Sequence, residues 1–160
     1  MYQSVRLTLI VEGHKYEEVV KFTETVDHIG IAVRNLDEAL RTYVAILGFE
    51  FKSRLVSEQQ KVNVVFLSAG NTEIELLEPT DTDGPVARFI EKRGEGLHHL
   101  ALVVDNIEEC IEAIRKNGMV LIDKKPRVGA KGEKIAFIHP KSTKGVLIEL
   151  CEGEKERTST

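Results

Sequence analysis

The sequence of 160 residues predicts an α+β fold built from two βαβββ modules. The first observation behind this prediction is an internal repeat, in which VDHIGIAVRNLDEAL at residues 26–40 resembles LHHLALVVDNIEECI at residues 97–111. The second is that short strand patterns follow both copies in the same order. The third is that each half carries one histidine and one glutamate at equivalent positions.

The first half begins with an apolar strand, and Asn-Leu-Asp-Glu at residues 35–38 then opens a helix with apolar residues at helical spacing. This helix is expected over residues 36–49, because Gly48 lies where a helix end needs a residue tolerant of positive φ. Short strands are expected at residues 50–53, 62–68 and 73–78, with the turn Ala-Gly-Asn at residues 69–71 closing a hairpin.

The second half repeats this order. Asn-Ile-Glu-Glu at residues 106–109 opens a helix expected over residues 107–120, with Gly118 at its end. Strands are expected at residues 120–122, 135–138 and 146–151, and residues 141–145 are expected to close the second hairpin.

The repeat sets the expected domain organisation. One domain contains a first module at residues 26–79 and a second module at residues 97–152. Residues 80–96 form a linker with a turn-rich TDTDGP and a short helix, VARFIEKRGEG. Residues 1–25 are an N-terminal extension of unknown role, in which LTLIVEG could form an edge strand and KYEEVVKFTE a helical turn, and residues 153–160 form a polar C-terminal tail.

Composition and charge limit the function classes. The net charge of −4 and the mixed signs argue against general nucleic-acid binding, which needs a strongly basic face. The apolar runs are too short to span a membrane, and the N-terminus resembles neither a signal peptide nor a transit peptide. Cys110 and Cys151 form no CxxC motif and no disulfide framework. A reduced, cytoplasmic location is therefore expected.

Strand alternation brings four polar side chains to one face. In the first strand of each half, His28 and His99 share a face with small residues, and the large aliphatic residues point to the helix side. In the last strands, TEIELLE and VLIELCE, Glu75 and Glu149 lie between apolar neighbours and point to the opposite face from them. If pseudo-symmetry relates the halves, two imidazoles and two carboxylates converge, which suits a divalent ion such as Co, Ni, Mn, Fe or Zn.

Three other histidines have less defined roles. His98 falls on the opposite face from His99 by strand alternation, so we expect it to be structural or to support a ligand from behind. His14 lies in the N-terminal extension and is expected at the surface. His139 begins a turn in FIHPK and is either structural or part of a pocket mouth.

These residues resemble a known family. The paired modules resemble the vicinal oxygen chelate, or glyoxalase-like, superfamily, and four segments are similar to the methylmalonyl-CoA epimerase family within it. They are HIGIAVRNLDEAL, GNTEIELLEP, GEGLHHLALVVDNIEE and FIHPKSTKGVLIELCE. The resemblance covers roughly residues 26–152, and the HHLA strand with the HPK…GVLIEL ending is its specific part.

The resemblance implies a curved, open, barrel-like mixed sheet around a metal site, usually in a homodimer. The family's metal ligands fall on His28, Glu75, His99 and Glu149, and cobalt is the expected ion, with manganese, nickel, iron and zinc as alternatives. Some relatives carry Gln at the position of Glu75, and the extra negative charge here should make the metal a weaker Lewis acid. The implied partner is a small acyl-CoA substrate, with a place in propionate metabolism.

The implied reaction interconverts the (R) and (S) epimers of methylmalonyl-CoA by proton abstraction at C2, through an enolate that a divalent cation stabilises. Epimerisation needs two proton-transfer groups, and the resemblance implies that Glu149 is one of them. The family's second carboxylate has no clear equivalent, because the strand KVNVVFL carries Asn63. Glu58, just before this strand, or a water molecule is left as the alternative.

The phosphates of CoA need a basic site. The loop DKKPRVGAKGEK, residues 123–134, offers cations that can meet phosphates as point charges or as a guanidinium fork, and a solvated charged turn is the alternative. The candidate substrate-binding residues are Lys124, Lys125, Arg127 and Lys131, with Lys134 nearby.

Three other functions remain open on the same scaffold. Lactoylglutathione lyase (glyoxalase I) uses a similar quartet, and Glu75 fits its ligand set. A non-catalytic binding module would commonly lack the quartet, so metal content separates it from an enzyme. An extradiol dioxygenase would need two histidines and one carboxylate around Fe(II), and the fourth ligand argues against it.

Overall fold

The computed structural model describes residues 9–16 and 25–153, and a mixed eight-stranded sheet is its main feature. The strand order is β4-β5-β6-β3-β7-β10-β9-β8. The first module supplies β3 (Val26–Ala32), β4 (Glu50–Ser57), β5 (Val62–Ser68) and β6 (Glu73–Pro79). The second module supplies β7 (Gly96–Val104), β8 (Arg127–Val128), β9 (Lys134–Ile138) and β10 (Ile148–Glu152).

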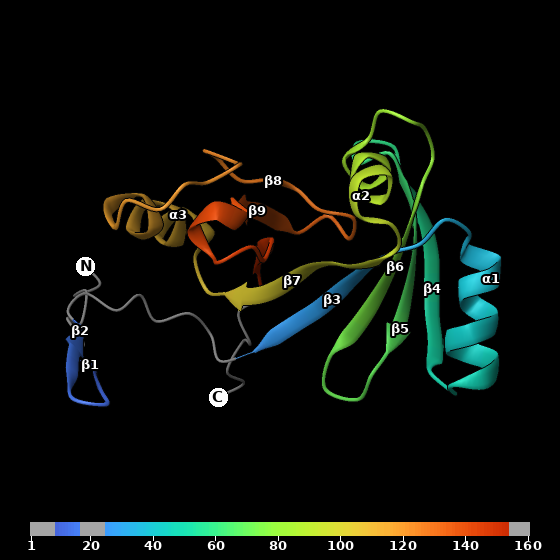
Figure 1. Ribbon diagram of the computed structural model, residues 1–160, viewed down its shortest axis with the longest axis horizontal. Helices are drawn as coiled ribbons and strands as arrows, with labels where there is room; N and C mark the ends of the chain where they lie inside the picture. Colours follow the sequence, from blue (N-terminus) through green and yellow to red (C-terminus); the bar gives the residue numbers. More distant parts are fainter. Residues whose placement is uncertain (1–8, 17–24, 154–160) are drawn as a thin grey trace, which may run out of the picture.

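The two modules repeat one topology and meet at the antiparallel pair of β3 and β7. Within each module the first strand pairs in parallel with the last, β3 with β6 and β7 with β10, and the other strands add on in antiparallel fashion. Figure 1 shows the two half-sheets turned relative to each other, so that the sheet curls. The predicted α+β fold of two βαβββ modules in a curved mixed sheet is therefore confirmed.

Both repeated helices begin where the sequence predicts them. Helix α1 (Leu36–Leu40) is capped by Asn35 and helix α3 (Ile107–Lys116) by Asn106, and each asparagine side chain accepts a hydrogen bond from the backbone N–H three residues later. Helix α2 (Pro85–Arg93) lies in the linker and has proline in its first turn. A short 3-10 turn, η2 (Pro140–Ser142), follows β9.

The hydrophobic core is divided between the two faces of the sheet. The repeated helices cover one face: α1 packs on Val65, Leu67 and Leu76 of its module, and α3 packs on Ala136 and Leu150 of the other. On the opposite face, α2 packs Val86 and Ile90 against inward-facing residues of the first module, namely Ala32, Val62, Val64, Phe66 and Leu77. The region between α2 and the second module stays open to solvent as a pocket.

Two expected elements of the first module differ in extent. The helix expected at residues 36–49 is α1 followed by a π-helical segment, η1 (Arg41–Ile46), in which the Leu47 N–H donates to the Thr42 carbonyl. Leu40, Tyr43 and Val44 pack on the same core cluster across this change of pitch. Strand β4 runs to Ser57 rather than stopping at residue 53, because it pairs along nearly the whole of β5.

The prediction of a strand at residues 120–122 is wrong, because no strand forms at these positions. Only one isolated bridge forms there, between Leu121 and Ile138. The Asp123 carboxylate accepts the hydrogen bond from the Phe137 N–H at 2.8 Å, which replaces a backbone partner and ends the pairing. Strand β8 at residues 127–128 is the edge strand instead.

The described part of the N-terminal extension forms a two-stranded hairpin of β1 (Leu9–Val11) and β2 (His14–Tyr16). LTLIVEG therefore contributes a strand, although β1 pairs with β2 and not with the main sheet. Most of KYEEVVKFTE, expected as a helical turn, lies outside the described residues. Among the described helices, none is both long and apolar enough to cross a membrane.

Candidate metal centre

The four side chains singled out by the repeat converge at the floor of the pocket. His28 comes from β3, Glu75 from β6, His99 from β7 and Glu149 from β10. All four are buried, with exposed fractions between 2% and 7%. They are brought together because β3 and β7 are the central strands, and β6 and β10 lie directly beside them.

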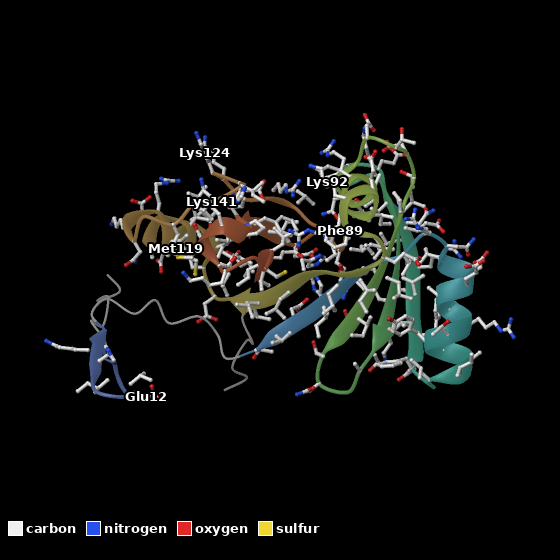
Figure 2. All side chains as sticks on the ribbon, viewed as in Figure 1. Glu12, Phe89, Lys92, Met119, Lys124 and Lys141 are labelled. Atoms are coloured by element: carbon white, nitrogen blue, oxygen red, sulfur yellow. The ribbon has the colours of Figure 1, made fainter. Side chains whose placement is uncertain are left out.

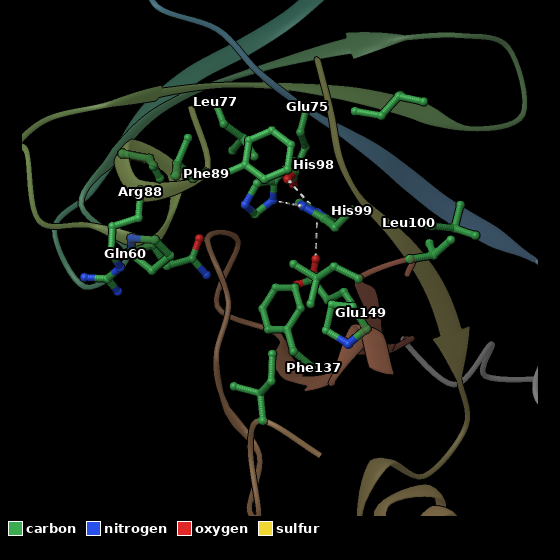
Figure 3. A pocket seen from close by; sticks show the side chains of 18 of the residues that line it. Gln60, Glu75, Leu77, Arg88, Phe89, His98, His99, Leu100, Phe137 and Glu149 are labelled. Carbon is green, nitrogen blue, oxygen red and sulfur yellow. Dashed lines mark hydrogen bonds and ion pairs between the residues drawn. The ribbon is translucent and has the colours of Figure 1, made fainter. Parts of the chain in front are cut away.

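The nitrogen and oxygen atoms of the four residues face one another. His28 Nε2 lies 2.9 Å from His99 Nε2 and 3.1 Å from Glu149 Oε2. Glu149 Oε2 also lies 2.9 Å from His99 Nε2, and Glu75 Oε2 lies 3.3 Å from His28 Nε2 and 3.7 Å from His99 Nε2. Figure 3 shows His99 between the two carboxylates.

A bulge in each central strand supplies the second ring nitrogen with a partner. Val26 pairs with Leu102 and His28 with Ala101, so Asp27 has no opposite residue, and its carboxylate accepts a hydrogen bond from His28 Nδ1 at 2.6 Å. In the neutral ring, this bond leaves Nε2 of His28 as the nitrogen with a free lone pair.

The second bulge falls at His98. Gly30 pairs with His99 and Ile31 with Leu97, so His98 is the extra residue of β7. Its Nδ1 lies 2.9 Å from Nδ1 of His99, and Figure 3 shows the two rings side by side. Strict alternation placed His98 on the opposite face; the bulge is the reason that it lines the pocket instead.

Gly30 gives the His99 ring the space that it occupies. A Cβ atom at residue 30 would lie 2.2 Å from Cε1 and 2.4 Å from Nδ1 of that imidazole. Any side chain there would force the ring to move. The small residues that the sequence places beside His28 therefore make room for the histidine of the other half.

Burial and close contact shift the pKa values of the site in opposite directions. Burial lowers the pKa of His28, but hydrogen bonds to Asp27 and Glu149 outweigh it and raise that pKa to about 10. Burial raises the pKa of Glu75 to about 6. For Glu149, burial is outweighed by the hydrogen bonds from both histidines, which lower its pKa to about 2. Burial also lowers the pKa of His98 to about 4, which keeps it neutral and able to accept a hydrogen bond from His99.

The donor set fits a divalent first-row ion. Ligand atoms that share one ion at about 2.1 Å lie roughly 3.0 Å apart at octahedral angles and 3.4 Å at tetrahedral angles. The five separations given above run from 2.9 to 3.7 Å and so bracket both values. In the metal-free protein His28 is protonated and its Nε2–H faces His99 and Glu149, and a divalent cation would supply positive charge in place of that proton.

The pocket above the four residues has a volume of about 1030 Å³, at the upper end for small-molecule sites. One wall is α2 with Arg88, Phe89, Lys92 and Arg93. The facing wall comes from the second module, with Ile122, Arg127, Phe137 and Val146 among its residues. His139 also lines the pocket on this side, and its Nδ1 accepts a hydrogen bond from the Lys141 N–H. His139 is therefore part of the pocket and also stabilises the turn that it begins.

The predicted phosphate-binding residues are dispersed. Arg127 lines the pocket, where its Nε lies 3.3 Å from Asp123 and its guanidinium covers the Phe137 ring. Lys131 instead reaches across to the first module, where it pairs with Glu73 and lies 4.4 Å from the centre of the Phe66 ring. Lys124 and Lys125 are exposed and lie outside the pocket lining.

The two side chains considered for a second proton transfer lie outside the pocket lining. Glu58 is exposed in the turn after β4. The Asn63 amide donates to Glu78, and the other Glu78 oxygen accepts from the Leu36 N–H at the start of α1. Asn63 therefore lies on the face of the sheet that α1 covers. Strand alternation requires this, because its neighbours Val62 and Val64 point to the opposite face, toward α2.

Sequence reasoning missed the basic side chains of α2 and the carboxylate partner of His28. Arg88, Lys92 and Arg93 were available as a cationic stripe at helical spacing within the linker. Asp27 was available as the neighbour of a candidate ligand, but strand alternation directs it away from His28 unless a bulge is known.

Comparison with known proteins gives one family match and several close relatives. Residues 27–137 match the model of the glyoxalase/bleomycin resistance protein/dioxygenase superfamily. An uncharacterized protein of Bacillus subtilis, YqjC, is 48% identical over 127 residues, which cover 79% of this chain and 91% of that protein. The human mitochondrial methylmalonyl-CoA epimerase is 36% identical over 126 residues, 78% of this chain and 72% of the human protein.

The fold comparison points the same way. A variant of Streptomyces coelicolor methylmalonyl-CoA epimerase, solved in complex with 2-nitronate-propionyl-CoA, superposes with a TM-score of 0.77. It is 36% identical in sequence, and the match covers 84% of this chain and 96% of that one.

Proposed function

The chain belongs to the methylmalonyl-CoA epimerase family of the glyoxalase/bleomycin resistance protein/dioxygenase superfamily, and we propose that it interconverts the (R) and (S) epimers of methylmalonyl-CoA at C2. The observation that carries the proposal is the buried quartet of His28, Glu75, His99 and Glu149 at the floor of a large pocket. The quartet would hold one divalent metal ion, and cobalt is our first choice among the ions that suit two imidazoles and two carboxylates. When bound, the ion supplies positive charge that offsets the charge developing on the substrate's thioester and carboxylate oxygens.

The residues of the chain itself orient the substrate and move its proton. The two histidines are fixed by Asp27 and His98, so their lone pairs stay directed at one point. Phe137 and Phe89 cover the site on two sides and reduce access of water to the reacting carbon. Glu149 is ionised because both histidines hold its pKa at about 2, and it accepts or returns the C2 proton on one face of the substrate.

Glu133 is our candidate for the second proton-transfer group. It lines the pocket, and one of its oxygens lies within 4.8 Å of a Glu149 oxygen and of Cys151 Sγ. Its carboxylate also accepts a hydrogen bond from the Lys131 N–H. The other pocket carboxylate outside the quartet, Asp123, is tied to Arg127 and to the Phe137 N–H.

Two further properties complete the proposal. We propose a homodimer, for which the exposed apolar side chains of Ile46, Leu47 and Phe51 near the sheet edge β4 are candidate contacts. We also propose a cytoplasmic location, which the two free cysteines support.

The decisive experiment follows deuterium incorporation at C2 of methylmalonyl-CoA by NMR, on enzyme loaded with Co(II) and on metal-stripped enzyme. We expect exchange and epimer interconversion that depend on the metal. Glu149→Gln should lower the interconversion rate by roughly a hundredfold or more, as loss of a proton-transfer group does. Glu152→Gln is the matched control, because it makes the same change three residues later, where the carboxylate accepts from the Ile107 N–H on the helix side.

The same preparations separate the rival functions. Absence of exchange with every divalent ion, together with turnover of the glutathione hemithioacetal, would replace the epimerase by lactoylglutathione lyase. Absence of both activities and of stoichiometric metal would leave a binding module.

A further inference from the structure

One face of α2 forms a cationic wall of the pocket. Arg88 and Lys92 are four residues apart, as are Phe89 and Arg93, so the four side chains form two adjacent rows on one face of the helix. All four line the pocket. The other face of α2 is apolar, and its Val86 and Ile90 are buried against the sheet, so the helix is fixed with its basic face toward the opening.

The three cations of this face have no carboxylate partner among the described residues. Lys61, Lys131 and Lys134, by contrast, each pair with an acidic side chain. Arg88 donates a hydrogen bond to the Asp83 carbonyl, which uses one part of its guanidinium and leaves its charge uncompensated. Three uncompensated positive charges along one pocket wall attract an anionic ligand.

The basic face stands at a distance from the metal centre. Phe89 contacts His98 with ring centres 4.9 Å apart, and His98 in turn contacts His99. Figure 3 shows Arg88 with Gln60 at the far side of Phe89 from His99. The pocket therefore has an inner end with the quartet and an outer end with the cations of α2.

Between the two ends the rim is apolar. Leu97, Ile122 and Val146 line the pocket and are 74%, 50% and 46% exposed, which is unusual for large aliphatic side chains unless they meet a ligand or partner. A ligand with a small acidic group at one end, a largely uncharged arm and phosphates at the other end matches this sequence of environments.

We propose that Arg88, Lys92 and Arg93 form the phosphate subsite for the CoA end of the substrate. This inference rests on the proposed function, because it assumes that the acyl end occupies the quartet. It assigns the phosphates to α2 and not to Lys124 and Lys125. Figure 2 shows Lys92 beside Phe89 on α2, whereas Lys124 stands apart from them over the second module.

The test compares two thioesters, methylmalonyl-CoA and methylmalonyl-pantetheine, of which only the first carries the 3′-phosphoadenosine diphosphate end with its phosphates. The variant R88Q/K92Q/R93Q removes the three charges, and R41Q/R115Q/K116Q removes the same number from exposed helical positions outside the pocket lining. We expect the first variant to raise KM for methylmalonyl-CoA at least tenfold with little change in kcat, and to leave KM for the pantetheine ester within about twofold. The control variant should leave both KM values unchanged.

A binding measurement without turnover gives an independent readout. Calorimetric titration of the metal-free protein with CoA should show at least tenfold weaker binding to R88Q/K92Q/R93Q than to the wild type, and binding should weaken with added salt. K124Q/K125Q tests the alternative loop.

The outcomes separate this proposal from the proposed function. Equal loss for both thioesters, or an unchanged CoA affinity, overturns the phosphate subsite, as does a larger loss of CoA binding in K124Q/K125Q. If the wild type turns over neither thioester, the epimerase assignment fails, and the calorimetric comparison with CoA alone then decides the subsite.

Discussion

At the residue scale, the positions of the two histidines depend on small features of the neighbouring strand. Gly30 leaves room for the His99 ring, and the bulges at Asp27 and His98 supply partners for the Nδ1 atoms. Partners of this kind fix the orientation of a ligand and typically change metal affinity ten- to a hundredfold.

Gly30→Ala should weaken metal binding by roughly tenfold or more, because the new methyl group displaces the His99 imidazole. Isothermal titration with Co(II) measures the effect. The control is Ala101→Gly, opposite His28 on the neighbouring strand, which perturbs the same pair of strands without pushing on a ring. Equal affinities for Gly30→Ala and the wild type would contradict this account of the glycine.

Metal binding should release protons at neutral pH. The pKa of His28 rises from 6.5 to about 10 in the metal-free protein, so its proton stabilises the folded state below pH 6.5 and this contribution is lost as the pH rises toward 10. A metal ion needs the neutral ring, so its apparent affinity should increase with pH across this window. Titrations at about pH 7.5 in buffers of different ionisation enthalpy should report release of about one proton, and His28→Gln should abolish most of it.

At the scale of the elements, each half uses its last strand twice. Glu75 and Glu149 point to the metal centre, and three residues later Glu78 and Glu152 accept hydrogen bonds from the first N–H groups of α1 and α3. An odd spacing places the two carboxylates of one strand on opposite faces. The same strand therefore builds the site and anchors the helix that covers its back.

The asparagine caps make a testable contribution to this anchoring. Asn106→Ala should lower the free energy of unfolding by about 1 kcal/mol, because the Glu109 N–H loses its acceptor. Urea denaturation measures the change. Asn106→Ser keeps an oxygen acceptor and should recover most of the stability, and a Ser variant as unstable as the Ala variant would argue against a capping role.

At the scale of the whole molecule, the two modules are joined at the site itself. The four proposed ligands come from four adjacent strands, two from each module, so a bound ion ties the modules together. Lys131 adds a second connection, since it extends from the second module to Glu73 and Phe66 of the first.

Metal removal should therefore lower the stability of the entire chain. At a free metal concentration a hundred times Kd, binding adds about 2.7 kcal/mol to the free energy of unfolding. Thermal unfolding with and without a chelator should show this as a clear drop in Tm. His99→Gln should lose most of the response, whereas His14→Gln, in the β1–β2 hairpin, should keep it.

The sequence by itself determined the repeat, the capped helices and the four converging side chains. These follow from local rules, because capping residues act within one turn and strand alternation has a fixed period of two. The repeat then predicted that the two halves bring their histidines and glutamates together, because equivalent strands occupy equivalent places in the two modules.

Only the tertiary structure decided what depends on departures from regularity and on contacts between distant segments. The bulges that bring Asp27 and His98 to the ligands cannot be read from alternation, because each bulge reverses it. The position of Lys131 could not be predicted either, because it pairs with Glu73 of the other module rather than lining the pocket. Nor could the loss of the strand at residues 120–122, which depends on the hydrogen bond from the Phe137 N–H to the Asp123 carboxylate. The position of α2 beside the pocket also could not be predicted from the sequence. Its basic face is directed toward the pocket only because its apolar face packs against the sheet of the first module.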